Sequence, residues 1–228
     1  YITLEHEHIL VFRKGEKREF KKELEKELRR ESAFFWEERN QWFSDVWEIR
    51  GTSQNLFNEK TRERSAAYPF EVVYRLINMF SIKNDVVLDP FLGTGTTMIA
   101  AMCTRRNSTH FEIDPNLEET ITGRLANMIS WGNQIIFDRI KSHQEFVNDR
   151  LENKKSPMKH QNKNYGFPVM TGQETDLKFD LLTDLKEVNR SEFEVHYKEL
   201  GTDGYKTDTG MKRDNVRKED DNLTKWFD

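Results

Sequence analysis

Two acidic residues follow apolar segments of this chain at a spacing that suits a ligand carrying a ribose. A branched apolar run at 86–88 ends at Asp89, and Glu112 stands about 20 residues beyond the turn that follows. That turn contains Gly93 and Gly95, which let the backbone approach a ligand closely. The N–H groups at the start of the next helix attract anions, and a carboxylate at a second strand end can hold ribose hydroxyls. The order strand, turn, helix and strand therefore predicts a cofactor site.

The residues of this turn also resemble a known family motif. Residues 89–96 match Asp-Pro-Phe-x-Gly-Ser/Thr-Gly-Thr, the first cofactor motif of the DNA amino-methyltransferases that make N6-methyladenine or N4-methylcytosine. Residues 66–81 resemble the Ala-x-Phe-Pro segment of that family, and residues 6–14 resemble a late strand in its beta motif order. The resemblance implies S-adenosylmethionine as cofactor. It also implies an α/β fold, a partial Rossmann-like methyltransferase sheet with a helical insertion and a C-terminal extension.

Individual residues of the motif have expected roles, and that of Asp89 is the one implied by the family. Asp89 would lie near the amino group of the cofactor, where a carboxylate complements a cation. Thr96 and Thr97 would cap the helix and offer donors to the cofactor's carboxylate. Glu112 is the preferred ribose ligand, and Asp114 is its rival on the same side of an extended strand. Residues 68–70 are expected to form an apolar wall of the cofactor site, although they could instead be a turn anchored in the core. The expected cofactor-binding residues are Tyr68, Pro69, Phe70, Asp89, Pro90, Phe91, Gly93, Thr94, Gly95, Thr96, Thr97, Glu112 and Asp114.

The catalytic signature of the family is missing from this sequence. That signature is Asp/Asn/Ser-Pro-Pro followed by an aromatic residue, and no two of the 5 prolines here are adjacent. In the beta order the tetrad precedes every segment recognised above. We therefore expect no catalytic residue in this chain, with the tetrad supplied by an upstream segment or a second polypeptide. The partner would pack through an apolar interface above ~2,000 Å².

These features predict the cofactor-binding and DNA-recognition portion of a site-specific DNA methyltransferase acting on adenine N6 or cytosine N4. The alternative is a non-catalytic DNA-binding or scaffold subunit that retains the fold. A nicotinamide dehydrogenase is excluded because the turn has no third glycine at the expected position.

Charge and composition limit the partners. A net charge of −4 argues against a uniformly basic surface for double-stranded DNA. A local basic strip remains, and we expect phosphate contacts from Lys17, Arg18, Lys21 and Lys22, with a solvated helix face as the open alternative. No run approaches the ~20 apolar residues of a membrane helix, so the expected location is the cytoplasm. His6 and His8 have no third ligand nearby, so we expect no metal.

The remaining pattern suggests four parts. They are a late strand of the sheet (1–15), a helical and aromatic-rich target-recognition insertion (16–62), the cofactor-binding subdomain (63–155) and a C-terminal extension with a partly disordered tail (156–228). Periodicity predicts strands at 5–13, 46–49, 86–89, 109–113, 176–182 and 192–197, helices at 16–38, 71–80 and from Pro115 to about 153 with a break near Gly132, and a linker at 157–164.

Overall fold

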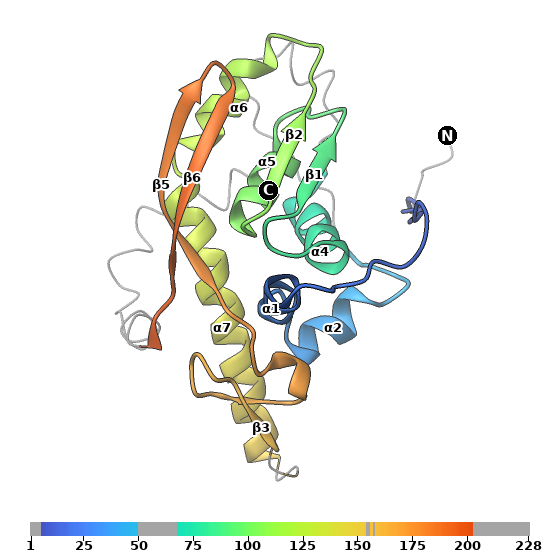
Figure 1. The fold of residues 1–228 in the computed structure, drawn as a ribbon, viewed down its shortest axis with the longest axis vertical. Helices are drawn as coiled ribbons and strands as arrows, with labels where there is room; N and C mark the ends of the chain where they lie inside the picture. Colours follow the sequence, from blue (N-terminus) through green and yellow to red (C-terminus); the bar gives the residue numbers. More distant parts are fainter. Residues whose placement is uncertain (1–5, 50–67, 154–155, 157, 203–228) are drawn as a thin grey trace.

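The computed structural model describes residues 6–49, 68–153, 156 and 158–202. Its elements form a mixed α/β arrangement along one long helix, α7, which runs through much of the molecule (Figure 1). In chain order they are α1 (Glu23–Glu31), α2 (Trp36–Trp42), α4 (Phe70–Phe80), β1 (Val86–Asp89), α5 (Thr96–Cys103), β2 (Asn107–His110), α6 (Leu117–Leu125), α7 (Met128–Glu152), β3 (His160–Gln161), β4 (Pro168–Val169), the 3-10 helix η1 (Gly172–Glu174), β5 (Asp180–Asn189) and β6 (Glu192–Glu199).

Strands β1 and β2 form a parallel pair in which Val86 lies opposite Asn107 and Asp89 opposite His110. A tight turn cannot join parallel neighbours, so the chain crosses between them through α5. Helix α5 is apolar and almost wholly buried, which explains its position under the sheet and against α4 and α7. The predicted α/β class and the order strand, turn, helix and strand are confirmed. The second strand ends at His110, three residues before the predicted end at 113.

One face of this sheet carries large apolar side chains that the described residues leave exposed. Val86 is 69% exposed and Leu88 is 63% exposed. Val87, between them, packs instead on the cluster that contains Ile77 of α4. Successive strand residues point to opposite faces, so Val86 and Leu88 share one face, called here the β1 face. Parallel sheets are normally covered on both faces, which makes this exposure unusual.

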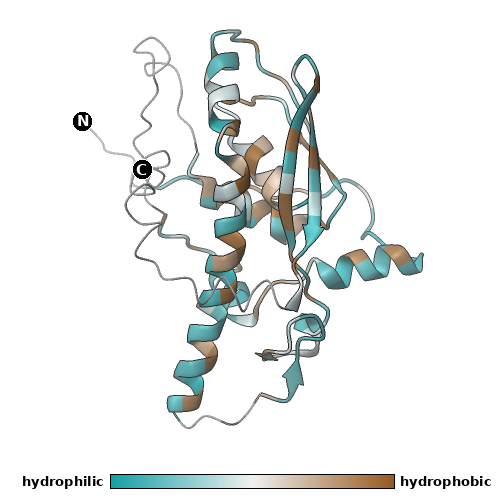
Figure 2. Ribbon diagram, turned by 90° about the vertical axis from the view of Figure 1, so that its left-hand side faces the viewer, coloured by the Kyte–Doolittle hydropathy of each residue, from teal (hydrophilic) through white to brown (hydrophobic). Residues whose placement is uncertain are grey.

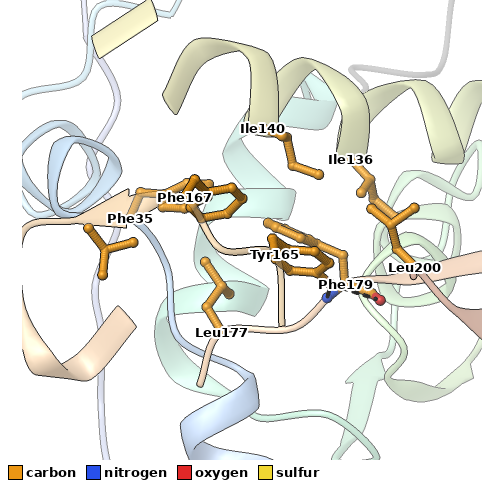
Figure 3. Close-up of a cluster of buried hydrophobic side chains, with 9 residues drawn as sticks. Phe35, Ile136, Ile140, Tyr165, Phe167, Leu177, Phe179 and Leu200 are labelled. Atoms are coloured by element: carbon orange, nitrogen blue, oxygen red, sulfur yellow. Dashed lines mark hydrogen bonds between the residues drawn. The ribbon is translucent and has the colours of Figure 1, made fainter. Parts of the chain in front are cut away.

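The most enclosed region lies where α7 packs on the chain that follows it. Nine buried residues form this α7 core, shown in Figure 3: Phe35, Ile136, Ile140, Tyr165, Phe167, Val169, Leu177, Phe179 and Leu200. The Tyr165 hydroxyl accepts a hydrogen bond from the backbone N–H of Phe179 at 2.6 Å. Residues 158–202 therefore share a core with α7 and with the segment between α1 and α2. The four-part division of the chain stays a prediction.

The linker predicted at 157–164 is wrong where the structure describes it. Asn162 is buried, and its side-chain amide donates to the carbonyls of Glu174 at 2.8 Å and Leu177 at 2.9 Å. A polar composition is typical of a linker, but here one amide satisfies buried backbone carbonyls. The prediction of two C-terminal strands is confirmed. They form the antiparallel hairpin β5–β6, which is longer than the sequence pattern indicated.

Helix α7 continues through Gly132 without the predicted break. Its buried positions recur every three or four residues, and Figure 2 shows hydrophobic and hydrophilic residues alternating around it. A methyl group added at Gly132 would lie 3.1 Å from Leu182 Cδ1 and 3.2 Å from Cys103 Sγ. This glycine therefore marks close packing of α7 on β5 and α5. Cys103 is buried, as predicted, and burial raises the pKa of its thiol.

Four charged side chains meet between the sheet and the hairpin and form the buried ion group. Lys83 Nζ lies 2.6 Å from Asp180 Oδ2 and 3.3 Å from Glu31 Oε2, and Arg105 Nη1 lies 2.8 Å from Asp180 Oδ1. The side chains of Lys83 and Asp180 are only 6% and 2% exposed. Buried charges need partners of opposite sign, and here one group joins α1, β5 and the two loops that precede β1 and β2.

The N-terminal predictions are wrong in several places. Residues 6–13 form no strand, and Phe12 is 86% exposed. Residues 46–49 also form no strand, and the helix predicted over 16–38 is two shorter helices, α1 and α2. A strand needs a neighbour to pair its backbone groups, and the described residues provide none for 6–13. Periodicity alone carries no information about that neighbour.

Candidate functional site

The glycine-rich turn lies at the carboxyl end of β1, where α5 begins. Gly93 has φ 55° and Gly95 has φ 87°, left-handed values that residues with a side chain rarely adopt. The Leu92 N–H donates to the carbonyl of Phe111 at 2.9 Å, and the Gly95 N–H donates back to the carbonyl of Leu92 at 3.0 Å. The turn is therefore held against the segment that follows β2.

Glu112 lies directly beside this turn. Its Oε2 accepts the Gly93 N–H at 2.7 Å, and its Oε1 accepts the Asp114 N–H at 2.9 Å. Each carboxylate oxygen has two lone pairs, so both can still accept a hydroxyl donor. The structure thus brings together the two features that the sequence pattern paired, the glycine turn and the acidic residue after the second strand.

Asp114 has a different local role. Its Oδ1 accepts the backbone N–H of Asn116 at 3.0 Å and the side-chain amide of the same residue at 2.6 Å, just before α6. The expectation that both acidic residues point to one side of a strand is wrong, because β2 ends at His110. Of the two candidates, Glu112 is the one that contacts the turn.

Asp89 ends β1, and its side chain also faces the turn. Oδ1 accepts the Phe91 N–H at 2.9 Å, which fixes the first step after the strand. Opposite it, neither ring nitrogen of His110 has a hydrogen-bond partner among the described residues. Burial lowers the pKa of His110, although Asp89 opposes that shift. The imidazole of His110 and the carboxyl group of Asp89 therefore lie side by side at the end of the sheet.

The hydroxyls of Thr94 and Thr96 face away from solvent. Both residues are buried, and both hydroxyls accept hydrogen bonds from Arg124 Nη1, at 3.0 Å and 3.2 Å. The predicted helix cap by Thr96 or Thr97 is wrong, since the N-cap of α5 is Gly95 and no side chain of the described residues caps it. The sequence motif gave no sign of Arg124, because it lies on α6, well outside the turn.

Apolar side chains border the site. Phe91 is 85% exposed and Ile113 is 97% exposed, while Pro90 is also exposed. Of the expected wall, Tyr68 is exposed, but Phe70 packs inward, with its ring centroid 4.5 Å from that of Trp131. For Phe70 the alternative interpretation, a residue anchored in the core, describes the structure better. Pro69 is the N-cap residue of α4.

The basic strip is partly engaged within the chain. Arg18 Nη1 contacts both carboxylate oxygens of Asp85, at 2.9 Å and 2.7 Å, and Lys21 lies 3.0 Å from Glu19. Lys17 and Lys22 are exposed. Two of the four predicted phosphate contacts would therefore have to exchange an existing partner for DNA.

The described residues contain no group of three or more His, Cys, Asp or Glu side chains that could hold a metal ion. None of the helices that the structure describes is both long and apolar enough to cross a membrane.

Comparison with known proteins adds curated relatives. The chain is 50% identical over 201 residues to the Type II methyltransferase M.MthZI of Methanothermobacter thermautotrophicus, a match that covers 88% of this chain and 55% of that protein. It is 50% identical over 126 residues to the Type II methyltransferase M.MjaI of Methanocaldococcus jannaschii, covering 55% of this chain and 40% of the relative. The chain thus spans about half the length of these relatives.

Among solved structures, a protein of Thermus thermophilus described as a DNA modification methylase and complexed with S-adenosyl-L-methionine is 33% identical, with a TM-score of 0.40. The match covers 50% of this chain and 40% of that one. Residues 1–123, more than half of this chain, match the family described as DNA methylase. The chain belongs to the DNA methylase family.

Proposed function

We propose that the chain is the cofactor-binding and DNA-recognition part of a site-specific DNA methyltransferase that methylates an exocyclic amine, adenine N6 or cytosine N4. The observation that carries the proposal is the contact between Glu112 and the N–H of Gly93, 2.7 Å long, within a motif typical of this family. The Type II methyltransferases that it resembles over 88% and 55% of its length support the same activity.

The residues at the end of β1 fit S-adenosylmethionine, which would supply the methyl group. Glu112 would accept the ribose hydroxyls, since its oxygens keep lone pairs beyond their two backbone contacts. Asp89 would complement the ammonium group, and the uncapped start of α5 would receive the carboxylate. Exposed Phe91 and Ile113 would flank the adenosine. The role of this chain in the reaction is then to hold the methyl donor in attack geometry.

The β1 face supports a further part of the proposal. Val86 and Leu88 present apolar surface that the other described residues leave exposed. We propose that a segment bearing the catalytic Pro-Pro tetrad, upstream in the same polypeptide or on another chain, packs on this face. The length of the relatives beyond the matched half is consistent with such a segment. The target base would be flipped into the pocket that the two parts complete.

The direct test of the cofactor proposal is calorimetry with S-adenosylmethionine. Glu112→Ala should weaken binding by about 1–3 kcal/mol, because donors buried in the complex lose their acceptor. Glu119→Ala is the control, since Glu119 is an exposed acidic residue on α6. Equal affinity for the parent and Glu112→Ala would remove Glu112 from the site. Binding by neither the chain nor the chain joined to its tetrad segment would overturn the function.

DNA recognition is tested by the salt dependence of binding. Lys21 and Lys22 belong to the predicted strip and lie at the start of α1. Changing both to Ala should flatten the slope of log affinity against log salt, by about 0.9 for each lost phosphate contact. The same two changes at Lys141 and Lys163, which pair with Glu145 and Asp176, provide the control. Equal slopes for the parent and the Lys21, Lys22 variant would mean that the strip is a solvated helix face.

A further inference from the structure

Arg124 contacts the glycine-rich turn at three atoms although it belongs to another element. Its Nη1 donates to the carbonyl oxygen of Thr94 at 2.6 Å, to the Thr94 hydroxyl at 3.0 Å and to the Thr96 hydroxyl at 3.2 Å. Thr94 and Thr96 are 3% and 6% exposed, so these acceptors are largely removed from water. Buried acceptors that lose their donor are costly, so these contacts constrain the turn.

The position of the Thr94 carbonyl decides how the turn presents its backbone. The peptide between Thr94 and Gly95 is held at both ends, its carbonyl by Arg124 and its N–H by the carbonyl of Leu92 at 3.0 Å. Because a peptide unit is planar, fixing both groups fixes its orientation. Gly95, on one side of this peptide, has a positive φ, and as a glycine it would otherwise allow the peptide to rotate.

Helix α6 lies directly against the turn at this point. A methyl group built on Gly95 would lie 3.5 Å from two carbons of Ile121, which precedes Arg124 by three positions on the same helix face. Ile121 therefore provides the apolar contact and Arg124 the polar one. The turn is positioned from outside the strand–turn–helix motif itself.

The charge of Arg124 is informative as well. A helix N-terminus carries a partial positive charge, so a cation beside it disfavours the free protein and favours an anionic ligand. Burial lowers the pKa of Arg124 to about 10, and the guanidinium therefore stays protonated at neutral pH. Arg124 lies in the last turn of α6, where a helix favours a cation, and its charge adds there to the attraction of the α5 start for an anion.

We infer that Arg124 is a positioning residue for the cofactor. It fixes the Thr94–Gly95 peptide and adds positive charge at the start of α5, so that this helix start receives the carboxylate of the cofactor's amino-acid group. The inference rests on the proposed function, because the identity of the ligand comes from there.

Two ligands separate positioning from a general structural role. S-adenosylhomocysteine carries the amino-acid carboxylate, whereas methylthioadenosine has the adenosine without it. Arg124→Gln should weaken binding of S-adenosylhomocysteine by about tenfold, the loss typical of a hydrogen bond to a charged group, and should affect methylthioadenosine much less. Arg124→Lys should recover most of the loss, since an ammonium restores the charge and a donor. Arg190→Gln, which removes an exposed arginine paired with Glu118, is the control. Equal losses for both ligands, or no loss for either, would overturn the inference.

Hydrogen exchange in the unliganded 228-residue chain gives a second readout. Arg124→Gln should speed exchange at the Gly95 amide, which bonds within the turn, and leave the amides of α7 and β5 unchanged. Faster exchange throughout the chain would mean that Arg124 stabilises the whole fold and not the turn in particular, and would overturn the inference. If the parent chain binds neither nucleoside, the proposed function is contradicted. Hydrogen exchange at the Gly95 amide then tests separately whether Arg124 positions the turn. Unchanged exchange at Gly95 would show that it does not.

Discussion

The α7 core and the β1 face are built from similar apolar residues but end in opposite environments. Ile140 in the α7 core is fully buried, whereas Leu88 on the β1 face is 63% exposed. In the α7 core, side chains from four separate segments surround α7, and the polar groups among them, such as Asn162, are satisfied. The β1 face has the residues of a core, but no element that the structure describes covers it.

This difference separates the parts of the chain whose apolar residues are buried from the part that, in our proposal, another segment covers. The α7 core and the buried ion group stabilise the described fold directly. The glycine turn lies at the end of β1, so the candidate site borders the face that the described residues leave exposed. The following predictions test that division.

The largest effect should come from the buried ion group. Asp180→Ala removes the acceptor of both Lys83 and Arg105, and leaves Lys83, only 6% exposed, without its shortest contact. Removing one partner of a buried pair is expected to cost about 3–5 kcal/mol in free energy of unfolding, measured by urea denaturation. Asp184→Ala on the same strand, which removes an exposed pair with Lys186, should change little. Similar midpoints for both variants would mean that Glu31 and the carbonyl of Lys178 suffice to satisfy Lys83.

A matched pair of apolar truncations compares the two regions directly. Ile140→Ala should lower the free energy of unfolding by about 2–5 kcal/mol, because it opens a cavity in the α7 core. Leu88→Ala should change it by no more than about 0.5 kcal/mol, as is usual for exposed positions. Both free energies are measured by urea denaturation. An unchanged slope of free energy against urea concentration would indicate an intact two-state transition.

The pair becomes sharper when the proposed tetrad segment is present. Leu88→Ala should then weaken association with that segment, while Ile140→Ala should not, provided that the fold remains intact. A large loss of stability from Leu88→Ala in the chain alone would show that the described residues already cover the β1 face, and would remove the argument for a covering segment.

The sequence predicted the local arrangement of the candidate site. Asp89, the two glycines and Glu112 lie together because strand, turn and helix are consecutive, and local order decides their positions. Phe70 was assigned to the cofactor wall, yet it packs against Trp131 in the core, because Tyr-Pro-Phe before a helix suits either role.

Interactions between distant segments could not be predicted. Arg124 contacts the turn from α6. Lys83 contacts Asp180 at the start of the hairpin, which packs on α7. Neither pair leaves a pattern of spacing in the sequence. The prediction of a strand at 5–13 is wrong over the described residues for the same reason. A strand needs a neighbouring strand, and sequence periodicity does not reveal that neighbour.

The buried ion group also has a consequence for the lifetime of the folded chain. Its members come from four segments far apart in sequence, so loop closure delays their meeting until much of the chain is already ordered. Charges that desolvate late contribute little to the folding transition state. Substitutions there should act mainly by speeding unfolding, with little change in the rate of folding. We therefore expect the buried ion group to slow the unfolding of the native state once it has formed.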